Sequence, residues 1–390
     1  MRVASLFSGV GGIELGLTRA RDDAELVSLC EVHEDARSVL AHNFPDVPLH
    51  RDVRELAALP DGVDVVTAGS PCGDFSSAGN AGRAPRGIDG AASGLLREVF
   101  RLLEGAPSVR HVVLENVDSM RTLHGGAGLR FAVAELTRLG FNWAYRVVSA
   151  RAFGLRQRRV RVVVVGRRGG GAPDWLVATD APAPTAETTA TAPFAAFSWC
   201  EGFRGSNFGL GEVPTLRANA GTRGLSIPSQ PAVIPLPVRD AGRAVVRLRP
   251  EDGEALQGLP RGWTACLPER RRFPRIGNSV PVPLFEWVGA HLDDAPRAPD
   301  GRSFDPMDMC AKLPRAAYGR ASGDAWAVDV GMYPKVAAPD LWRPSEEDVL
   351  SVRATTGYLE RARRGRPAMP EWAMQLIRAH AAALAGRPSK

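Results

Sequence analysis

The clearest candidate for chemistry in this chain is Cys72, which follows the apolar run 63–68 in the stretch Gly-Ser-Pro-Cys-Gly-Asp-Phe-Ser. A thiolate attacks where a thiol does not, so a nucleophilic cysteine needs partial exposure and a positive local potential. Pro71 restrains the backbone before the thiol, and the flanking glycines let a ligand come close. No Cys-x-x-Cys pair or nearby histidine indicates a metal site. These features predict a nucleophile on a loop after a buried strand, with a half-buried cysteine in a tight turn as the alternative.

Three carboxylates occupy similar positions along the chain. Glu31, Asp52 and Glu115 each close a short apolar run that is typical of a buried strand. The carboxyl ends of parallel strands meet at one edge of an open α/β sheet, and ligands bind there. Each acid alone is typical of a cap or a surface charge. Three of them at separate strand ends, with the Cys72 loop among them, indicate a site.

A glycine-rich loop, Ser8-Gly9-Val10-Gly11-Gly12, lies between the first predicted strand and a helical pattern that begins at Ile13. Backbone amides at such a helix start face a ligand, and glycines remove the side chains that would keep it away. Glu31 lies about 20 residues further on, where an acid can accept hydrogen bonds from ribose hydroxyls. The pattern predicts a cofactor that contains a nucleoside. Taken alone, it also permits an NAD-type oxidoreductase.

Strands and helices alternate through the first half of the chain, which predicts an α/β fold with a doubly wound, mostly parallel sheet. The strands are expected at 2–7, 24–30, 47–51, 63–68, 111–114, 142–149 and 162–165, and the helices at 34–44, 95–104 and 128–139. At 390 residues the chain exceeds one ordinary core, so we expect a second, smaller body. Further helices are expected at 247–266, 284–291 and 371–385, a possible strand at 326–330, and a solvated linker at 361–366.

The composition favours a nucleic-acid partner. The formal net charge is +6, and arginine greatly outnumbers lysine. Arginine offers planar donors to phosphates and guanine edges, although a GC-rich coding bias would give a similar composition. Five scattered cysteines fit a reducing compartment, and no apolar run approaches the roughly 18 residues of a membrane span. We therefore expect a cytoplasmic protein with no membrane association.

Five short motifs together resemble the DNA cytosine carbon-5 methyltransferases of bacterial or phage type. They are Phe7-Ser8-Gly9-Val10-Gly11-Gly12, Pro71-Cys72, Glu115-Asn116-Val117, Gln157-x-Arg159-x-Arg161 and Gly277-Asn278-Ser279-Val280, in the order of that family. The resemblance covers about residues 1–293. It implies a sheet of the S-adenosylmethionine-dependent methyltransferase type, a small irregular DNA-recognition domain and a C-terminal extension. It also implies S-adenosylmethionine as cofactor.

The resemblance implies roles for individual residues. The catalytic set is Cys72, Glu115, Arg159 and Arg161. The cofactor set is Phe7, Ser8, Gly9, Gly11, Gly12, Ile13, Glu31, Val32, Asp52, Val53, Pro71, Asn278 and Ser279. Two positions depart from the family pattern, because Gly73 stands where glutamine is usual and Val32 where a large apolar or aromatic residue is usual.

The segment 199–246 is rich in glycine, arginine and asparagine. Arginine and asparagine can bond guanine and adenine edges at two points, and this segment occupies the place of the family's target-recognition domain. The candidate DNA-binding residues are Arg204, Asn207, Arg217, Asn219 and Arg223. A variable surface insertion is the alternative.

The implied domains are a catalytic and cofactor-binding domain at 1–168, a target-recognition domain at 169–246, a return to the catalytic domain at 247–293, and an extension of unassigned role at 294–390. Double-stranded DNA is the expected partner of a monomer, and a cognate restriction endonuclease is a candidate partner in the cell. We expect a chain that ends near residue 295 to keep its activity if it folds.

Three alternatives remain at this point. A tRNA-modifying branch of the family shares the motifs, although the long 170–250 insertion favours DNA. An NAD-type oxidoreductase leaves Cys72, Glu115 and the arginines without a purpose. A catalytically silent DNA-binding homologue does not account for the intact Pro-Cys and Glu-Asn-Val motifs.

Overall fold

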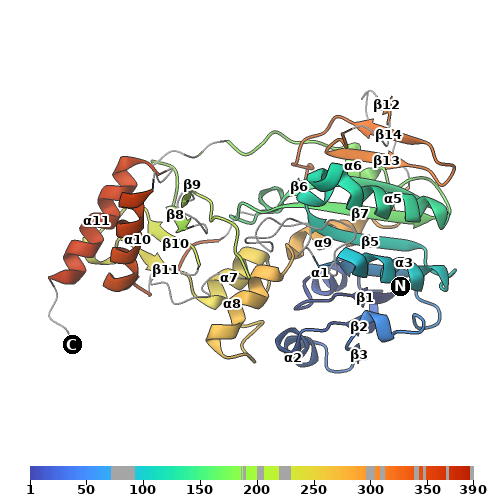
Figure 1. The fold of residues 1–390 in the computed structure, drawn as a ribbon, viewed down its shortest axis with the longest axis horizontal. Helices are drawn as coiled ribbons and strands as arrows, with labels where there is room; N and C mark the ends of the chain where they lie inside the picture. The colour runs from blue at the N-terminus through green and yellow to red at the C-terminus, as the bar shows by residue number, and fades with distance from the viewer. Residues whose placement is uncertain are drawn as a thin grey trace. The chain divides into compact units, whose positions relative to one another are not determined.

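The computed structural model describes residues 1–71, 93–185, 187, 190–199, 206–218, 230–295, 304–307, 312–337, 342–345, 348–365 and 369–386. The chain divides into two compact units. Unit 1 comprises Met1–Phe153, Val160–Ala183 and Val280–Ala338, and unit 2 comprises Gly154–Arg159, Pro184–Ser279 and Pro339–Lys390. Figure 1 shows both units and labels most of their helices and strands.

Unit 1 is built on a ten-stranded sheet with the order β12-β14-β13-β6-β7-β5-β4-β1-β2-β3. The strands are β1 Arg2–Leu6, β2 Glu25–Cys30, β3 Leu49–His50, β4 Val65–Gly69, β5 His111–Val117, β6 Phe141–Ser149, β7 Val160–Arg168, β12 Phe304–Pro306, β13 Ala316–Gly319 and β14 Ala325–Val328. The run β3-β2-β1-β4-β5 is parallel, and the pairings from β5 to β12 are antiparallel. The predicted α/β class is confirmed, and its parallel half carries the candidate site.

Helices cover both faces of this sheet, which explains its nearly continuous apolar strands. On one face Val3, Val65 and Val113 pack with residues of α1 (Gly12–Ala20) and α9 (Val282–His291). On the other face Ala4, Val66 and Val112 pack with residues of α3 (Leu96–Glu104) and α5 (Ala127–Arg138). The remaining helices of unit 1 are α2 Glu34–Asn43, α4 Ser119–Thr122 and α6 Trp175–Ala178, with short 3-10 turns η1 Val53–Glu55, η3 Ser93–Leu95, η4 Leu123–Gly126 and η5 Ala150–Phe153.

Unit 2 contains an antiparallel four-stranded sheet with the order β11-β10-β8-β9. Its strands are β8 Phe194–Trp199, β9 Ser206–Leu210, β10 Ala232–Pro235 and β11 Val246–Arg247. Its helices are α7 Pro250–Gln257, α8 Glu269–Asn278, α10 Val352–Arg364 and α11 Glu371–Ala385, with the turn η6 Ala241–Arg243. α7 and α8 pack on one face of the sheet, and α10 and α11 pack on the other.

Several expectations about the second half of the chain need correction. The helix expected at 247–266 is only α7, because Gly258 adopts a left-handed φ of 78° and ends it. The linker expected from Arg361 lies in α10 as far as Arg364, since the apolar face of that helix packs on the small sheet. Residues 247–279 pack in unit 2, and the assignment of 247–293 to the catalytic domain stays a prediction. The helix at 371–385 is confirmed. Among the described helices, none combines the length and apolar character that a bilayer span requires.

Candidate active site

The loop after β1 is shaped by three residues with positive φ. Phe7, Gly9 and Gly11 have φ values of 56°, 57° and 86°, and α1 begins directly afterwards. Glu31, at the end of the neighbouring β2, accepts a hydrogen bond from the Gly9 amide at 2.8 Å and another from the His33 amide at 2.8 Å. The ribose acid predicted from sequence therefore lies against the predicted cofactor loop and helps to hold its shape.

The two loop glycines serve different purposes. A Cβ added at Gly9 would meet no heavy atom within 4 Å, so the backbone there faces open space that a ligand could fill. A Cβ at Gly11 would come within 2.5 Å of the Phe44 ring, so this glycine permits the packing of α2. The open backbone at Gly9, beside a strand-end carboxylate and a helix start, fits a cofactor that contains a nucleoside.

A buried carboxyl group lies beneath this loop. Glu14 is fully buried in α1 and accepts a short hydrogen bond from the Ser5 hydroxyl. The Ser8 hydroxyl lies 3.1 Å from the same Ser5 oxygen. Burial raises the pKa of Glu14 from 4.5 to about 7. We did not predict this residue, although an acid among the buried positions of an amphipathic helix is the signal that could have found it.

Three further cofactor candidates, Asp52 and Val53 after β3 and Val32 after β2, differ in burial and in hydrogen bonding. Asp52 accepts hydrogen bonds from the Arg54 amide and guanidinium, and the Arg54 guanidinium lowers the pKa of Asp52 to about 2. Val53 is buried in the core, whereas Val32 is 58% exposed. The predicted adenine acceptor is thus a charged carboxylate that already binds an arginine.

Glu115 and Arg161 form an ion pair at the edge of the sheet. Arg161 Nε lies 2.7 Å from Glu115 Oε1, and their side chains are only 12% and 8% exposed. Glu115 is the register partner of Gly69 at the end of β4. A Cβ built on Gly69 would lie 3.9 Å from Glu115 Oε2 and 3.8 Å from the Phe7 carbonyl. The pair therefore lies beside both the glycine loop and the start of the nucleophile loop.

The base of the nucleophile loop is held by the residue after Glu115. The Asn116 amide donates to the Ser70 carbonyl at 3.1 Å and to the Ser70 hydroxyl at 2.9 Å. Pro71 follows, and the predicted nucleophile Cys72 lies outside the described residues. Asn116 therefore fixes the chain two residues before the predicted nucleophile, a role that the Glu-Asn-Val motif alone did not indicate.

Gln157 and Arg159, the other two residues of the Gln157-x-Arg159-x-Arg161 motif, connect segments of unit 2. Arg159 is buried and donates to the carbonyl oxygens of Gly277, at 3.3 Å, and Ser279. Gln157 is fully buried and donates to the Leu256 carbonyl at 3.0 Å. Asn278, between the two carbonyls, is exposed. Arg159 thus anchors the segment predicted to complete the cofactor pocket.

The recognition candidates fall partly within the described residues. Asn207 lies on β9, and Arg217 follows a segment in which Leu216 bonds to the Gln157 side chain. A Cβ at Gly277 would lie 2.4 Å from the Arg217 carbonyl carbon, so the end of α8 packs directly on this backbone.

The structure brings one group of predicted residues together in unit 1. This group, at the carboxyl edge of β1, β2, β4 and β5, comprises Phe7, Ser8, Gly9, Gly11, Gly12, Ile13, Glu31, Pro71, Glu115 and Arg161. A second group belongs to unit 2 and comprises Asn207, Arg217, Arg159, Asn278 and Ser279. Three DNA-binding candidates, Arg204, Asn219 and Arg223, lie outside the described residues.

Comparison with known proteins agrees with this arrangement. Residues 1–192 match the family model described as C-5 cytosine-specific DNA methylase. The type II methyltransferase M2.BsuMI of Bacillus subtilis (strain 168) is 34% identical over 386 residues, which cover 93% of this chain and 94% of that protein. The type II methyltransferase M.NlaX of Neisseria lactamica is 25% identical, with coverage of 75% and 96%. A match over 93% of the chain extends well beyond Leu292, where we wrongly expected the resemblance to stop.

Solved structures share the fold. The Dnmt2 methyltransferase of S. pombe has a TM-score of 0.54 at 14% identity, with coverage of 75% of this chain and 98% of that chain. A DNMT2 mutant from Spodoptera frugiperda has a TM-score of 0.52 at 15% identity, with coverage of 75% and 99%. At such identities the likeness concerns the fold alone.

Proposed function

The chain belongs to the C-5 cytosine-specific DNA methylase family and is a DNA cytosine methyltransferase, and on this premise we propose that Cys72, Glu115 and Arg161 act on a flipped-out cytosine in a specific duplex sequence. The observation that carries the proposal is the nearly buried Glu115–Arg161 pair between the glycine loop and the base of the nucleophile loop. Perturbed or paired charges at a sheet edge of this kind are typical of active sites.

S-adenosylmethionine is the proposed cofactor, and it would supply the electrophilic methyl group. The open backbone at Gly9 and the Glu31 carboxylate fit its nucleoside and amino-acid portions. Asp52 follows β3, the outermost parallel strand, and Ile13 of α1 lies beside Gly69 at the end of β4. We also propose that Asn278 and Ser279, where Arg159 donates to the Gly277 and Ser279 carbonyl oxygens, bind the cofactor.

Carbon 5 of cytosine is a poor nucleophile until carbon 6 is attacked. The Cys72 thiolate forms a bond to carbon 6, and the electron pair of the 5,6 double bond moves toward carbon 5 and the ring. Glu115 accepts a hydrogen bond from the exocyclic amine and shares a proton from solvent with ring nitrogen 3, which becomes more basic as the thiolate adds. Arg161 donates a hydrogen bond to the carbonyl oxygen, so both residues stabilise the charge that develops. After carbon 5 has gained the methyl group, water or hydroxide takes its proton and Cys72 leaves as the thiolate.

The target cytosine must leave the base stack before this chemistry. A base inside a duplex is out of reach, and flipping costs a few kcal/mol that protein contacts offset. Double-stranded DNA is therefore the proposed substrate. A cognate restriction endonuclease is the candidate cellular partner, and we expect the monomer to be active.

A mechanism-based trap tests the covalent step. DNA in which the target cytosine carries fluorine at carbon 5 still accepts the thiol and the methyl group, but no proton remains for elimination. We expect a protein–DNA adduct that survives denaturing electrophoresis, forms only with S-adenosylmethionine, and is absent in Cys72→Ala. The same trap with tRNA should give no adduct. Failure to form the DNA adduct, on DNA shown by bisulfite sequencing to carry the site, would overturn the mechanism.

A further inference from the structure

We propose that the C-terminal segment 342–386 is part of the target-recognition domain and that Trp372 is a positioning residue for the β8–β9 hairpin. This inference rests on the proposed function, and it assigns a role to a segment that lies beyond the family motifs. It predicts that the segment governs the binding of the DNA site rather than the chemistry on cytosine.

The first support is the core of unit 2. Ala195, Phe197, Ala232 and Ile234 form one face of the small sheet, and all four are buried. The residues that cover them come from the C-terminal segment, with Tyr358 from α10 and Ala373, Met374 and Ile377 from α11. The Phe197 and Tyr358 rings lie 4.6 Å apart. Among the described residues, the C-terminal helices therefore supply much of the apolar layer on this face of the sheet, together with Ala244 and Val245.

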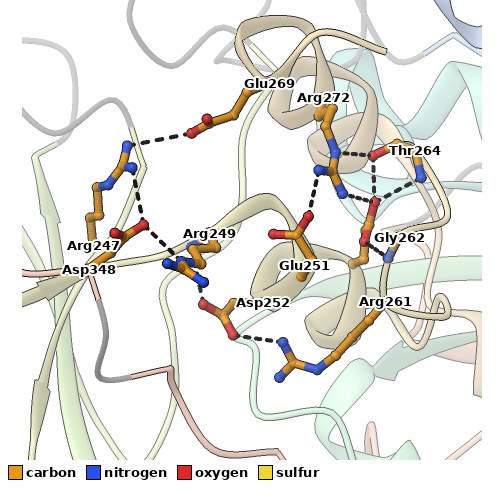
Figure 2. Close-up of polar contacts among 11 residues, drawn as sticks. Arg247, Arg249, Glu251, Asp252, Arg261, Gly262, Thr264, Glu269, Arg272 and Asp348 are labelled. Atoms are coloured by element: carbon orange, nitrogen blue, oxygen red, sulfur yellow. Dashed lines mark hydrogen bonds and ion pairs between the residues drawn. The ribbon is translucent and has the colours of Figure 1, made fainter. Parts of the chain in front are cut away.

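The second support is a set of polar bonds between the same parts. Asp348 pairs with Arg249 at 2.9 Å and with Arg247 at 3.1 Å, and these bonds are drawn in Figure 2. The Arg249 guanidinium lowers the pKa of Asp348, so the carboxylate is charged at neutral pH. The chain at Val349 then forms a β-bridge with Val246 on β11. The segment is thus joined to the strands by backbone as well as by charge.

A buried histidine adds a third connection. His380 of α11 is fully buried, and its two ring nitrogens each lie 3.0 Å from a carbonyl oxygen, one of Ala241 and one of Leu350. Whichever ring nitrogen carries the proton, His380 donates to a carbonyl outside α11, and this hydrogen bond favours one position of the helix along its axis. A rigid back layer of this kind can set the position of the strands that it covers.

Trp372 of α11 contacts β9, the strand that carries the DNA-binding candidate Asn207. Its ring meets the Phe208 ring edge-on, with centroids 5.9 Å apart and planes at 78°. Phe208 lies on β9, the edge strand of the sheet, directly after the candidate Asn207. Phe208 packs toward the C-terminal helices, so the neighbouring Asn207 points to the opposite face. Pairing with β8 holds the strand that carries Asn207 along its length, and the Trp372 ring supports the same strand from the helical layer.

The test compares two tryptophans of the C-terminal extension in the full-length protein. Trp372→Leu removes the contact with Phe208, whereas Trp326→Leu removes a comparable stacked contact with Tyr318 in unit 1. For Trp372→Leu we expect the KM for DNA to rise about fivefold while kcat changes less than about twofold, because the lost contact supports a strand proposed to bind DNA and does not touch the reacting atoms. Discrimination against a site with one altered base should fall as well.

The control and a conservative variant make the outcome decisive. Trp326→Leu should leave the KM for DNA and the discrimination unchanged, and Trp372→Phe should restore most of both. S-adenosylhomocysteine binding by calorimetry should be the same in all three variants. Equal effects of the two leucine substitutions, or no effect of Trp372→Leu, would overturn the inference. A parent protein that methylates no DNA would instead overturn the proposed function, so the two failures are distinct.

Discussion

At the scale of single residues, the Glu115–Arg161 ion pair is almost completely shielded from solvent. Removing one partner of such a pair leaves the other charge uncompensated, and it also removes the contact proposed for ring nitrogen 3. We expect Glu115→Gln to lower kcat by about 10²–10³-fold, measured in a single-turnover methylation assay.

A matched control separates this effect from a general loss of charge. Glu135 also pairs with an arginine, Arg138, but on an exposed helix surface at 2.8 Å. Glu135→Gln should therefore leave kcat and stability nearly unchanged. A Glu115→Gln rate close to that of the parent would assign the stabilising role to another group.

Glu14 makes stability depend on pH. Its folded pKa of about 7 exceeds its ordinary 4.5, so the folded state binds the proton more tightly than the unfolded state. The contribution of protonated Glu14 to the free energy of unfolding is complete below pH 4.5 and is lost as the pH rises through about 7. The pKa difference corresponds to a loss of about 3 kcal/mol. Urea unfolding of the parent and of Glu14→Gln, without ligand, should show this loss only in the parent. Parallel pH curves would contradict the assignment.

At the scale of elements, the end of α8 illustrates how closely backbone segments approach. Gly277 lies against the Arg217 backbone, and a Cβ there would come within 2.4 Å of it. We expect Gly277→Ala to destabilise the protein by about 1–3 kcal/mol, because backbone has to move. Gly105→Ala is the control, since its Cβ would meet only the Leu102 carbonyl oxygen at 3.8 Å. Thermal unfolding followed by circular dichroism measures both, and equal melting temperatures would contradict the close packing.

At the scale of the whole molecule, the C-terminal extension belongs to both units. β13 pairs with β6 in the large sheet, and the buried Arg146 on β6 donates to the Gly331 carbonyl at 3.1 Å. α10 and α11 complete the core of unit 2. A chain that ends near residue 295 therefore loses parts of two cores, so we expect that it does not fold, which is the condition on which its activity depends.

Truncation tests this directly. A chain ending at 295 should be aggregated or loosely folded and should bind a hydrophobic dye, since apolar surface of both units becomes exposed. A chain ending at Gly386, which keeps all of α11, should unfold and methylate like the parent. An active, cooperatively folding chain of 295 residues would show that the extension is dispensable.

Exchange of the recognition segment follows the same reasoning. Moving 199–246 from a relative into this chain replaces β9 and β10, but it leaves most of β8 and the helices that cover the small sheet unchanged. We expect the target sequence to change cleanly only when 184–279 and 339–386 are moved together, as bisulfite sequencing in a methylation-free host would show. A clean change with 199–246 alone would restrict recognition to that segment.

The sequence by itself determined the elements and motifs that depend on nearby residues. Apolar runs closed by acids correctly placed Glu31 directly after β2, whereas Glu115 lies within β5, two residues before that strand ends at Val117. The spacing of glycines predicted the loop after β1. The α/β class followed from alternation along the chain, because hydrophobic periodicity is a local property. These features required no knowledge of what packs against them.

Only the tertiary structure decided which partners these residues meet. Arg159 and Arg161 are two positions apart, yet one holds carbonyls at the end of α8 and the other pairs with Glu115. The amphipathic pattern of α10 shows that one face is buried, but it does not say that the small sheet covers it. The physical reason is that periodicity specifies the buried face of an element, whereas the covering element is selected by packing between residues that are distant in sequence.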